Sequence, residues 1–248
     1  TFKGKIAMAA GIRLYVDGPL GAGAAVEATA DQAHYLGRVM RLGVGDPILL
    51  FNGRDGEWRA EITRMDKRAA EMAIREKTRD QTEAAGPWLA FAPVKKTGTD
   101  FIVQKATELG ASRLMPVATA NTQTGRTNTA RLRAQAVEAA EQCERLSVPE
   151  VSDMTDLDTL LADWPQDRPL FALDETGGGA PLAAVAATAG AAVGFLVGPE
   201  GGFQARELDR FAKLPFITPV TLGPRILRAE TACLAALSVW QAVVGDWT

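Results

Sequence analysis

From Pro87 to the C-terminus, short apolar runs alternate with segments of helical periodicity. This alternation is typical of a mostly parallel sheet covered by helices. Strands are predicted at Trp88–Val94, Arg113–Val117, Leu170–Leu173, Val193–Val197 and Phe216–Leu222. Helices are predicted over residues 100–109, 128–145, 205–213 and 227–244. Residues 87–248 are therefore expected to form an α/β domain.

The preceding residues, 11–78, follow a different pattern of short strands. These strands are predicted at Ile12–Val16, Pro47–Phe51, Glu57–Thr63 and Ala70–Arg75. The segment Asn52–Gly56 between two of them is a strong hairpin signal. A short helix is expected over Ala30–Met40, with Asp31 as its cap. The pattern predicts a small β-barrel, joined to the α/β domain by a polar linker at residues 79–86.

Two glycine–proline turns follow predicted strands near the C-terminus, Gly198–Gly202 and Gly223–Arg225. A glycine at a strand end lets the backbone approach a ligand closely, because it has no Cβ. If the two strands are neighbours, the turns form a small-molecule crevice at the carboxyl edge of the sheet. The main-chain N–H groups of Gly201 and Gly202 would then suit a carboxylate or another anion. Ordinary strand-to-helix loops are the alternative.

Several common ligands lack sequence support. Neither turn has the GxxxxGK[ST] spacing of a phosphate loop or the GxGxxG spacing of a dinucleotide-binding turn. The chain has one histidine and two cysteines, Cys143 and Cys233, which are far apart in sequence. This composition offers no metal-site spacing, so no metal is expected. Both cysteines are interpreted as buried thiols in a reducing compartment.

Charged side chains gather beside the second turn, where Arg225, Arg228 and Glu230 fall within six residues. Two interpretations stay open. Glu230 could pair with a neighbouring arginine in the first turn of the helix, or an arginine could contact a nucleic-acid phosphate or base. In the first glycine–proline turn, Gly198–Gly202, Glu200 either holds loop amides or touches a ligand.

The net charge is −3, so nucleic-acid binding would need local basic patches. Residues 1–85 hold 13 Lys and Arg against 12 Asp and Glu, whereas residues 86–248 hold 14 against 18. Arg38 and Arg41 are expected on one helical face near Arg13, and Lys95 and Lys96 at the crevice mouth. Phosphate contact and a solvated face are the two interpretations of these cations.

No part of the sequence predicts a membrane partner. No apolar run has the length of a membrane span. The stretch Thr1–Gly11 lacks the apolar core of a secretory signal peptide.

Six blocks along the chain together resemble the 16S ribosomal RNA uridine-N3 methyltransferase family, of the SPOUT superfamily. The blocks are His34–Gly43, Leu50–Gly53, Gln104–Gly110, Glu138–Cys143, Val197–Gly202 and Leu222–Thr231. No single block is specific, but their ordered set is.

The resemblance implies a PUA-like RNA-binding barrel at residues 11–78 and a methyltransferase domain with a C-terminal trefoil knot at residues 87–248. It also implies a cytoplasmic homodimer that acts on 16S rRNA or the 30S subunit. The cofactor implied is S-adenosylmethionine. Its binding residues would be Leu173, Val197, Gly198, Pro199, Glu200, Gly201, Leu222, Gly223, Pro224, Ile226 and Leu227.

For methyl transfer to uracil N3, Arg225 and Arg228 are the candidates for orienting the base or stabilising its charge. Glu200 or Glu230 would accept a hydrogen bond or the N3 proton. The RNA contacts would be Arg13, Arg38, Arg41, Lys95 and Lys96.

One departure from the family concerns the segment after the second strand of the α/β domain. Relatives often carry an arginine there, whereas this chain reads Thr119 to Arg126. Arg126 either takes over that contact or the contact is absent.

Two other functions remain open from the sequence. One is a SPOUT methyltransferase that acts on another RNA such as tRNA, and the other is a non-catalytic RNA-binding assembly factor. Binding of S-adenosylmethionine would separate an enzyme from the assembly factor.

Overall fold

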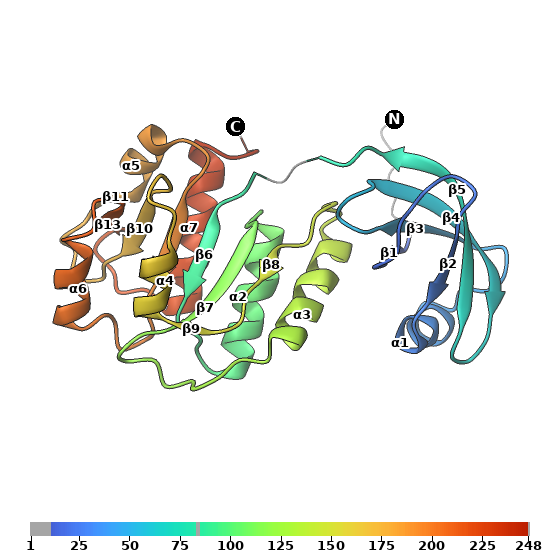
Figure 1. Ribbon diagram of the computed structural model, residues 1–248, viewed down its shortest axis with the longest axis horizontal. Coiled ribbons are helices and arrows are strands. Elements are labelled where there is room, and N and C mark those ends of the chain that lie inside the picture. Colours follow the sequence, from blue (N-terminus) through green and yellow to red (C-terminus); the bar gives the residue numbers. More distant parts are fainter. Residues whose placement is uncertain (1–10, 83–84, 248) are drawn as a thin grey trace, which may run out of the picture. The chain divides into compact units, whose positions relative to one another are not determined.

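The computed structural model describes residues 11–82 and 85–247, which belong to two compact units (Figure 1). The first unit holds the N-terminal part of the chain together with residues 140–147, and the second holds the rest. Residues 1–10, for which no signal peptide was expected, lie outside the described residues. No helix in the described part of the chain is long and apolar enough to cross a membrane.

The first unit is built on a five-stranded sheet of order β1-β3-β4-β5-β2. Its strands are β1 (Arg13–Tyr15), β2 (Ala25–Ala28), β3 (Pro47–Phe51), β4 (Glu57–Met65) and β5 (Ala70–Arg79). All pairs are antiparallel except β1 with β3. The predicted hairpin joins β3 to β4, and Asn52 stabilises its turn because Asn52 Oδ1 accepts the N–H groups of Arg54 and Asp55.

The predicted helix of this unit is shorter and less regular than expected. α1 (Ala30–His34) continues as a π-helical segment, η1 (Tyr35–Val39). The cap is Thr29 rather than Asp31, because Thr29 and Gln32 form a reciprocal capping box. Arg38 lies in η1, whereas Arg41 follows it with a left-handed φ of 58°. The expectation that the two arginines share one helical face is therefore wrong.

The second unit has an all-parallel sheet of order β11-β13-β10-β12-β6-β7-β8, with β9 paired to β7. Its strands are β6 (Trp88–Phe91), β7 (Arg113–Ala118), β8 (Glu150–Val151), β9 (Thr155–Asp156), β10 (Leu170–Leu173), β11 (Ala180–Pro181), β12 (Gly194–Val197) and β13 (Ile217–Thr221). The predicted parallel α/β architecture is confirmed, and the trefoil knot stays a prediction.

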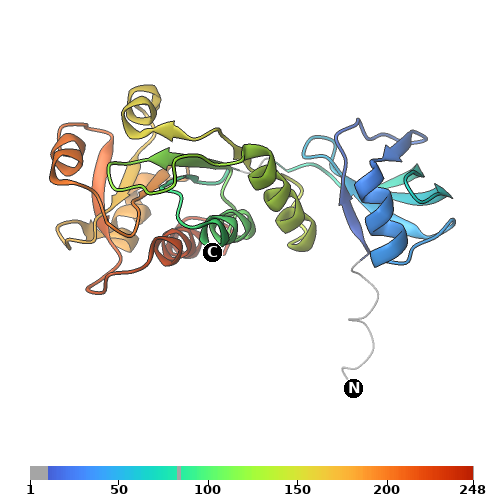
Figure 2. The ribbon, with the colours of Figure 1, turned by 90° about the horizontal axis from the view of Figure 1, so that it is seen from below.

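Helices cover both faces of this sheet. They are α2 (Lys96–Glu108), α3 (Thr129–Gln142), α4 (Leu157–Asp163), α5 (Leu182–Ala189), α6 (Ala205–Phe211) and α7 (Ala229–Val243). One core cluster joins the sheet to α2, α3, α5 and α7, and a second joins it to α4 and α6. α2 and α7 run side by side (Figure 2). Along β6, Leu89 and Phe91 belong to the first cluster and Ala90 to the second, as strand alternation requires.

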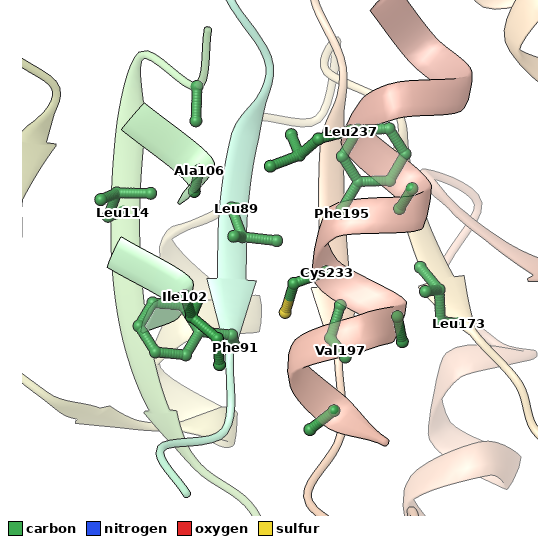
Figure 3. Close-up of a cluster of buried hydrophobic side chains, with 14 of the residues drawn as sticks. Leu89, Phe91, Ile102, Ala106, Leu114, Leu173, Phe195, Val197, Cys233 and Leu237 are labelled. Atoms are coloured by element: carbon green, nitrogen blue, oxygen red, sulfur yellow. The ribbon is translucent and has the colours of Figure 1, made fainter. Parts of the chain in front are cut away.

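Cys233 lies in the centre of the first cluster, where α7 faces Val197 and Phe195 of β12 (Figure 3). Burial, together with the charge of Glu230, raises the pKa of the Cys233 thiol far above its usual range. The thiol is therefore an inert part of the core. Cys143, by contrast, is exposed, so its predicted burial is wrong.

Candidate functional site

A cavity of about 230 Å³ opens at the carboxyl ends of β10, β12 and β13. Both glycine–proline turns line it, as the sequence predicts. Their strands are not neighbours, however, because β10 lies between β12 and β13 and pairs with both. The end of β10 therefore supplies the middle wall, through Leu173, Asp174 and Glu175. This arrangement matches the edge of a parallel sheet where ligands bind.

Ten of the eleven predicted cofactor residues line this cavity, and Pro224 does not. Gly202, expected in the crevice as an anion-binding amide, also lines the cavity. Six further lining residues were not expected from the sequence, which are Asp174, Glu175, Val220, Thr221, Ala229 and Ala232. Asp174 and Glu175 could have been found, because they directly follow the predicted strand that ends at Leu173 and are followed by Thr176-Gly177.

The four predicted catalytic residues separate into two pairs. Arg225 and Glu200 line the cavity with exposed side chains. Arg228 is the N-cap residue of α7 and Glu230 lies in its first turn, and neither lines the cavity. No ion pair joins Glu230 to Arg225 or Arg228 within the described residues, so the expected pairing is not found there.

The first turn uses one of its amides internally. Gly202 has a left-handed φ of 64°, and its N–H donates to Pro199 O at 2.9 Å. The prediction that the Gly202 N–H binds an anion is therefore wrong. In the second turn, Gly223 has a φ of 103°, a conformation reserved for glycine.

Other main-chain groups around the cavity have no hydrogen-bond partner among the described residues. Gly198, Leu222 and Leu227 line it, and their N–H and C=O groups make no hydrogen bond within the described part of the chain. A polar ligand of the cavity can pair with these groups, while Leu173, Val197 and Ala232 supply apolar wall. The site thus combines apolar surface with a few polar groups, as small-molecule sites do.

A buried hydrogen-bond brace holds the first turn against the loop after β7. Glu207 of α6 is 8% exposed. Its carboxylate accepts the N–H of Ala120 at 2.9 Å and that of Gln204 at 2.7 Å. Asn121 Nδ2 donates to the carbonyls of Gly201 and Gly202 at 2.9 and 3.1 Å. The brace therefore positions the turn that forms one cavity wall.

Glu207→Gln is expected to lower the melting temperature, because its new NH₂ group must face one of the two N–H donors. An unpaired buried donor costs about 1–3 kcal/mol, and each kcal/mol corresponds to about 2–4 °C for a chain of this size. Thermal unfolding measures the change. Asp209→Asn, on the exposed side of the same helix, is the control, and an equal effect of both variants would refute the role of the brace.

The predicted RNA-contacting cations lie in different surroundings. Lys95 and Lys96 begin α2 and are exposed, as are Arg38 and Arg41 in the first unit. Arg13 is instead buried, with its guanidinium bonded to Glu57 at 2.7 Å. It also donates to main-chain carbonyls of residues 140, 141 and 145. Because these partners occupy the guanidinium, the predicted phosphate contact of Arg13 is wrong.

Comparisons with known proteins point in one direction. The RNA methyltransferase domain model matches residues 84–241, and the RNA methyltransferase PUA domain model matches residues 28–74. The ribosomal RNA small subunit methyltransferase E of Rickettsia conorii is 31% identical over 228 residues, covering 91% of this chain and 93% of the relative. That of Bacillus subtilis is 30% identical over 223 residues, covering 85% and 87%. The structure of the Neisseria gonorrhoeae protein of that name, bound to S-adenosyl methionine, matches with a TM-score of 0.87 at 29% identity, covering 95% of this chain and 99% of that chain.

Proposed function

This chain belongs to the ribosomal RNA small subunit methyltransferase E family of RNA methyltransferases, and we propose that it methylates N3 of a uridine in the 16S rRNA. The cofactor of this reaction is S-adenosylmethionine. The cavity at the ends of β10, β12 and β13 is the observation that carries the proposal.

The residues of the cavity fit this cofactor. Gly223 leaves room for close backbone approach, because a Cβ there would meet no atom within 4 Å, whereas the missing Cβ atoms of Gly198 and Gly201 make room for Phe203 and Asn121. The open main-chain groups of Leu222 and Leu227 can pair with the polar edge of the adenine or with the amino-acid part. Leu173, Val197 and Ala232 offer apolar contact to the rings.

When bound, the cofactor supplies a methyl group that its sulfonium already activates, so the protein mainly aligns the acceptor. Uracil N3 must lose a proton, and negative charge develops on the base. Arg225 lies at the cavity with an exposed guanidinium, which can stabilise that charge. Glu200 can accept a hydrogen bond from the base or its N3 proton. Arg228 and Glu230 take supporting positions at the start of α7.

Arg225→Ala is expected to lower kcat about 10- to 150-fold, which corresponds to a lost charge-assisted hydrogen bond of about 1.5–3 kcal/mol. Arg225→Lys should recover part of the rate, since it keeps the charge but not the planar donor pair. Transfer of a labelled methyl group to rRNA measures the rate. A wild-type rate in Arg225→Ala would remove this residue from the mechanism.

The proposal extends to the partners of the enzyme. Residues 11–78 act as the RNA-binding PUA-like domain, 79–86 as the linker and 87–248 as the methyltransferase domain. The enzyme works in the cytoplasm as a homodimer. Ile226, which is 82% exposed beside the cavity, would be buried by a second copy placed there. Sedimentation equilibrium tests this association.

The deciding experiment uses small ribosomal subunits from a strain without this enzyme. Incubation with the purified protein and S-adenosylmethionine should produce 3-methyluridine in the 16S rRNA, detected by mass spectrometry. Methylation of tRNA instead would support the alternative substrate. No cofactor binding at millimolar concentration would reject the enzyme and favour a non-catalytic assembly factor.

A further inference from the structure

A polar cleft of about 690 Å³ lies in the second unit where α2 and α3 begin. Its lining includes Lys96 and Thr99 from the first turn of α2, and Arg126, Thr127 and Thr129 from the approach to α3 and its start. Cations and hydroxyl groups thus make up most of the cleft lining, whereas glycines and apolar side chains make up most of the cofactor cavity, together with Arg225 and three acids.

Two cations of the cleft have no partner among the described residues. Lys96 and Arg126 are exposed, and neither forms an ion pair or a side-chain hydrogen bond within the described residues. The third cation, Arg131, pairs with Asp100. The lining also holds one acid, Asp153, which accepts the Thr129 hydroxyl at 2.5 Å. Lys96 and Arg126 therefore remain free to bind an anion.

A buried hydroxyl group in the same lining lacks a partner. Thr127 Oγ1 is shielded from solvent and makes no hydrogen bond to any described residue. A buried hydroxyl without a partner is unfavourable, so a turn of the Thr127 side chain toward an acceptor in the cleft would remove that penalty. The N-terminal ends of α2 and α3 add partial positive charge at the same place, and α2 has no side-chain cap.

The cleft continues toward the cofactor cavity. It shares Val94 and Thr124 with an intermediate pocket of about 560 Å³, which Lys95 and Asn121 also line. That pocket shares Glu200 and Gly201 with the cofactor cavity. A nucleotide that presents its base at Glu200 can therefore extend its backbone past Lys95 into the cleft.

We propose that the cleft at Lys96, Arg126 and Thr127 is a phosphate subsite for the RNA strand adjoining the target uridine. Lys96 and Arg126 contact phosphate oxygens as charged donors, and the Thr127 hydroxyl donates to one of them. The inference rests on the proposed function, because the intermediate pocket then receives the uracil.

The double variant Lys96→Gln/Arg126→Gln tests the charged contacts. With small ribosomal subunits from the deletion strain as the probe, its Kd should rise about tenfold at moderate salt. The slope of log K against log salt should fall by about 1 for each side chain. The affinity for S-adenosylmethionine, measured by calorimetry, should stay at the wild-type value. Lys213→Gln, in the exposed turn after α6, is the control and should bind rRNA normally.

Thr127→Val tests the hydroxyl separately. It should weaken RNA binding about fivefold, yet keep or raise the melting temperature of the free protein, because no protein partner is lost. A structural role would instead lower the melting temperature and leave the RNA affinity unchanged.

The outcomes separate this inference from the proposed function. If wild-type protein methylates the rRNA while the double variant keeps the wild-type Kd and salt slope, the phosphate subsite is overturned and the enzyme stands. If wild-type protein does not methylate the rRNA, the proposed function is refuted, independently of the Kd of the double variant.

Discussion

Gly202→Val is expected to weaken S-adenosylmethionine binding about 5- to 150-fold, or about 1–3 kcal/mol. Gly202 has a φ of 64°, where a β-branched residue is an outlier that costs about 1–3 kcal/mol. A Cβ at this position would also meet the Glu175 carboxylate, but that side chain is exposed and can swing aside, so the backbone strain carries the effect. The turn can relieve the backbone strain only by moving residues 199–202, which form one wall of the cavity.

Isothermal calorimetry with the cofactor measures this loss. Gly202→Asn should lose less affinity, because asparagine tolerates the left-handed region better than valine. Gly21→Val is the matched control, since a Cβ at Gly21 meets no atom within 4 Å and its φ is not left-handed. A cofactor affinity of Gly202→Val close to the wild-type value would show that the turn does not shape the site.

The five longer strands of the second unit, β6, β7, β10, β12 and β13, could be predicted because each lies in a mostly apolar run between polar or glycine-rich segments. β10, predicted at Leu170–Leu173, has the predicted bounds. The order of the strands could not be predicted in the same way. A parallel strand covered on both faces is apolar throughout, so its sequence does not indicate its neighbours. This is why the insertion of β10 between the two glycine-turn strands was not foreseen.

The strands that were missed are short, and the longest of them is β2, with four residues. β8, β9 and β11 have two residues each, too few for any periodicity. α4 could have been found, because Asp156 caps it by accepting the N–H of Thr159 at 2.8 Å. Leu157, Leu160 and Leu161 then follow at helical spacing.

The features of the candidate site also differ in whether the sequence could predict them. Its glycine turns are local features, since left-handed backbone and close approach leave a mark at the glycine itself. The brace depends on contacts between distant segments, because Glu207 and Asn121 meet only when α6 packs beside the loop after β7. The sequence does not show whether an arginine side chain is buried or exposed, so Arg13 could not be distinguished from Arg38.

Arg13→Met is expected to destabilise the first unit by about 3–5 kcal/mol, because it leaves a buried carboxylate without its main partner. Arg13 and Glu57 are 7% and 4% exposed, and Arg13 Nε donates to Glu57 Oε2 at 2.7 Å. The guanidinium also lies 4.3 Å from the centroid of the Phe51 ring. In the variant, Glu57 keeps the Thr78 hydroxyl at 3.0 Å and the half-exposed Arg79 at 3.7 Å, which compensate for only part of the loss.

Hydrogen exchange of the amides in β3 and β4 measures the free energy of opening of this unit directly. Glu57→Gln in the Arg13→Met background should recover part of that free energy, since the uncompensated charge is then gone. Arg13→Lys should lie in between, because it keeps the charge but cannot bond Glu57 and the carbonyls of residues 140, 141 and 145 together. A loss below about 1 kcal/mol would place the pair with ordinary surface ion pairs. If Arg13→Met instead weakened rRNA binding and left the opening free energy unchanged, Arg13 would be an RNA contact after all.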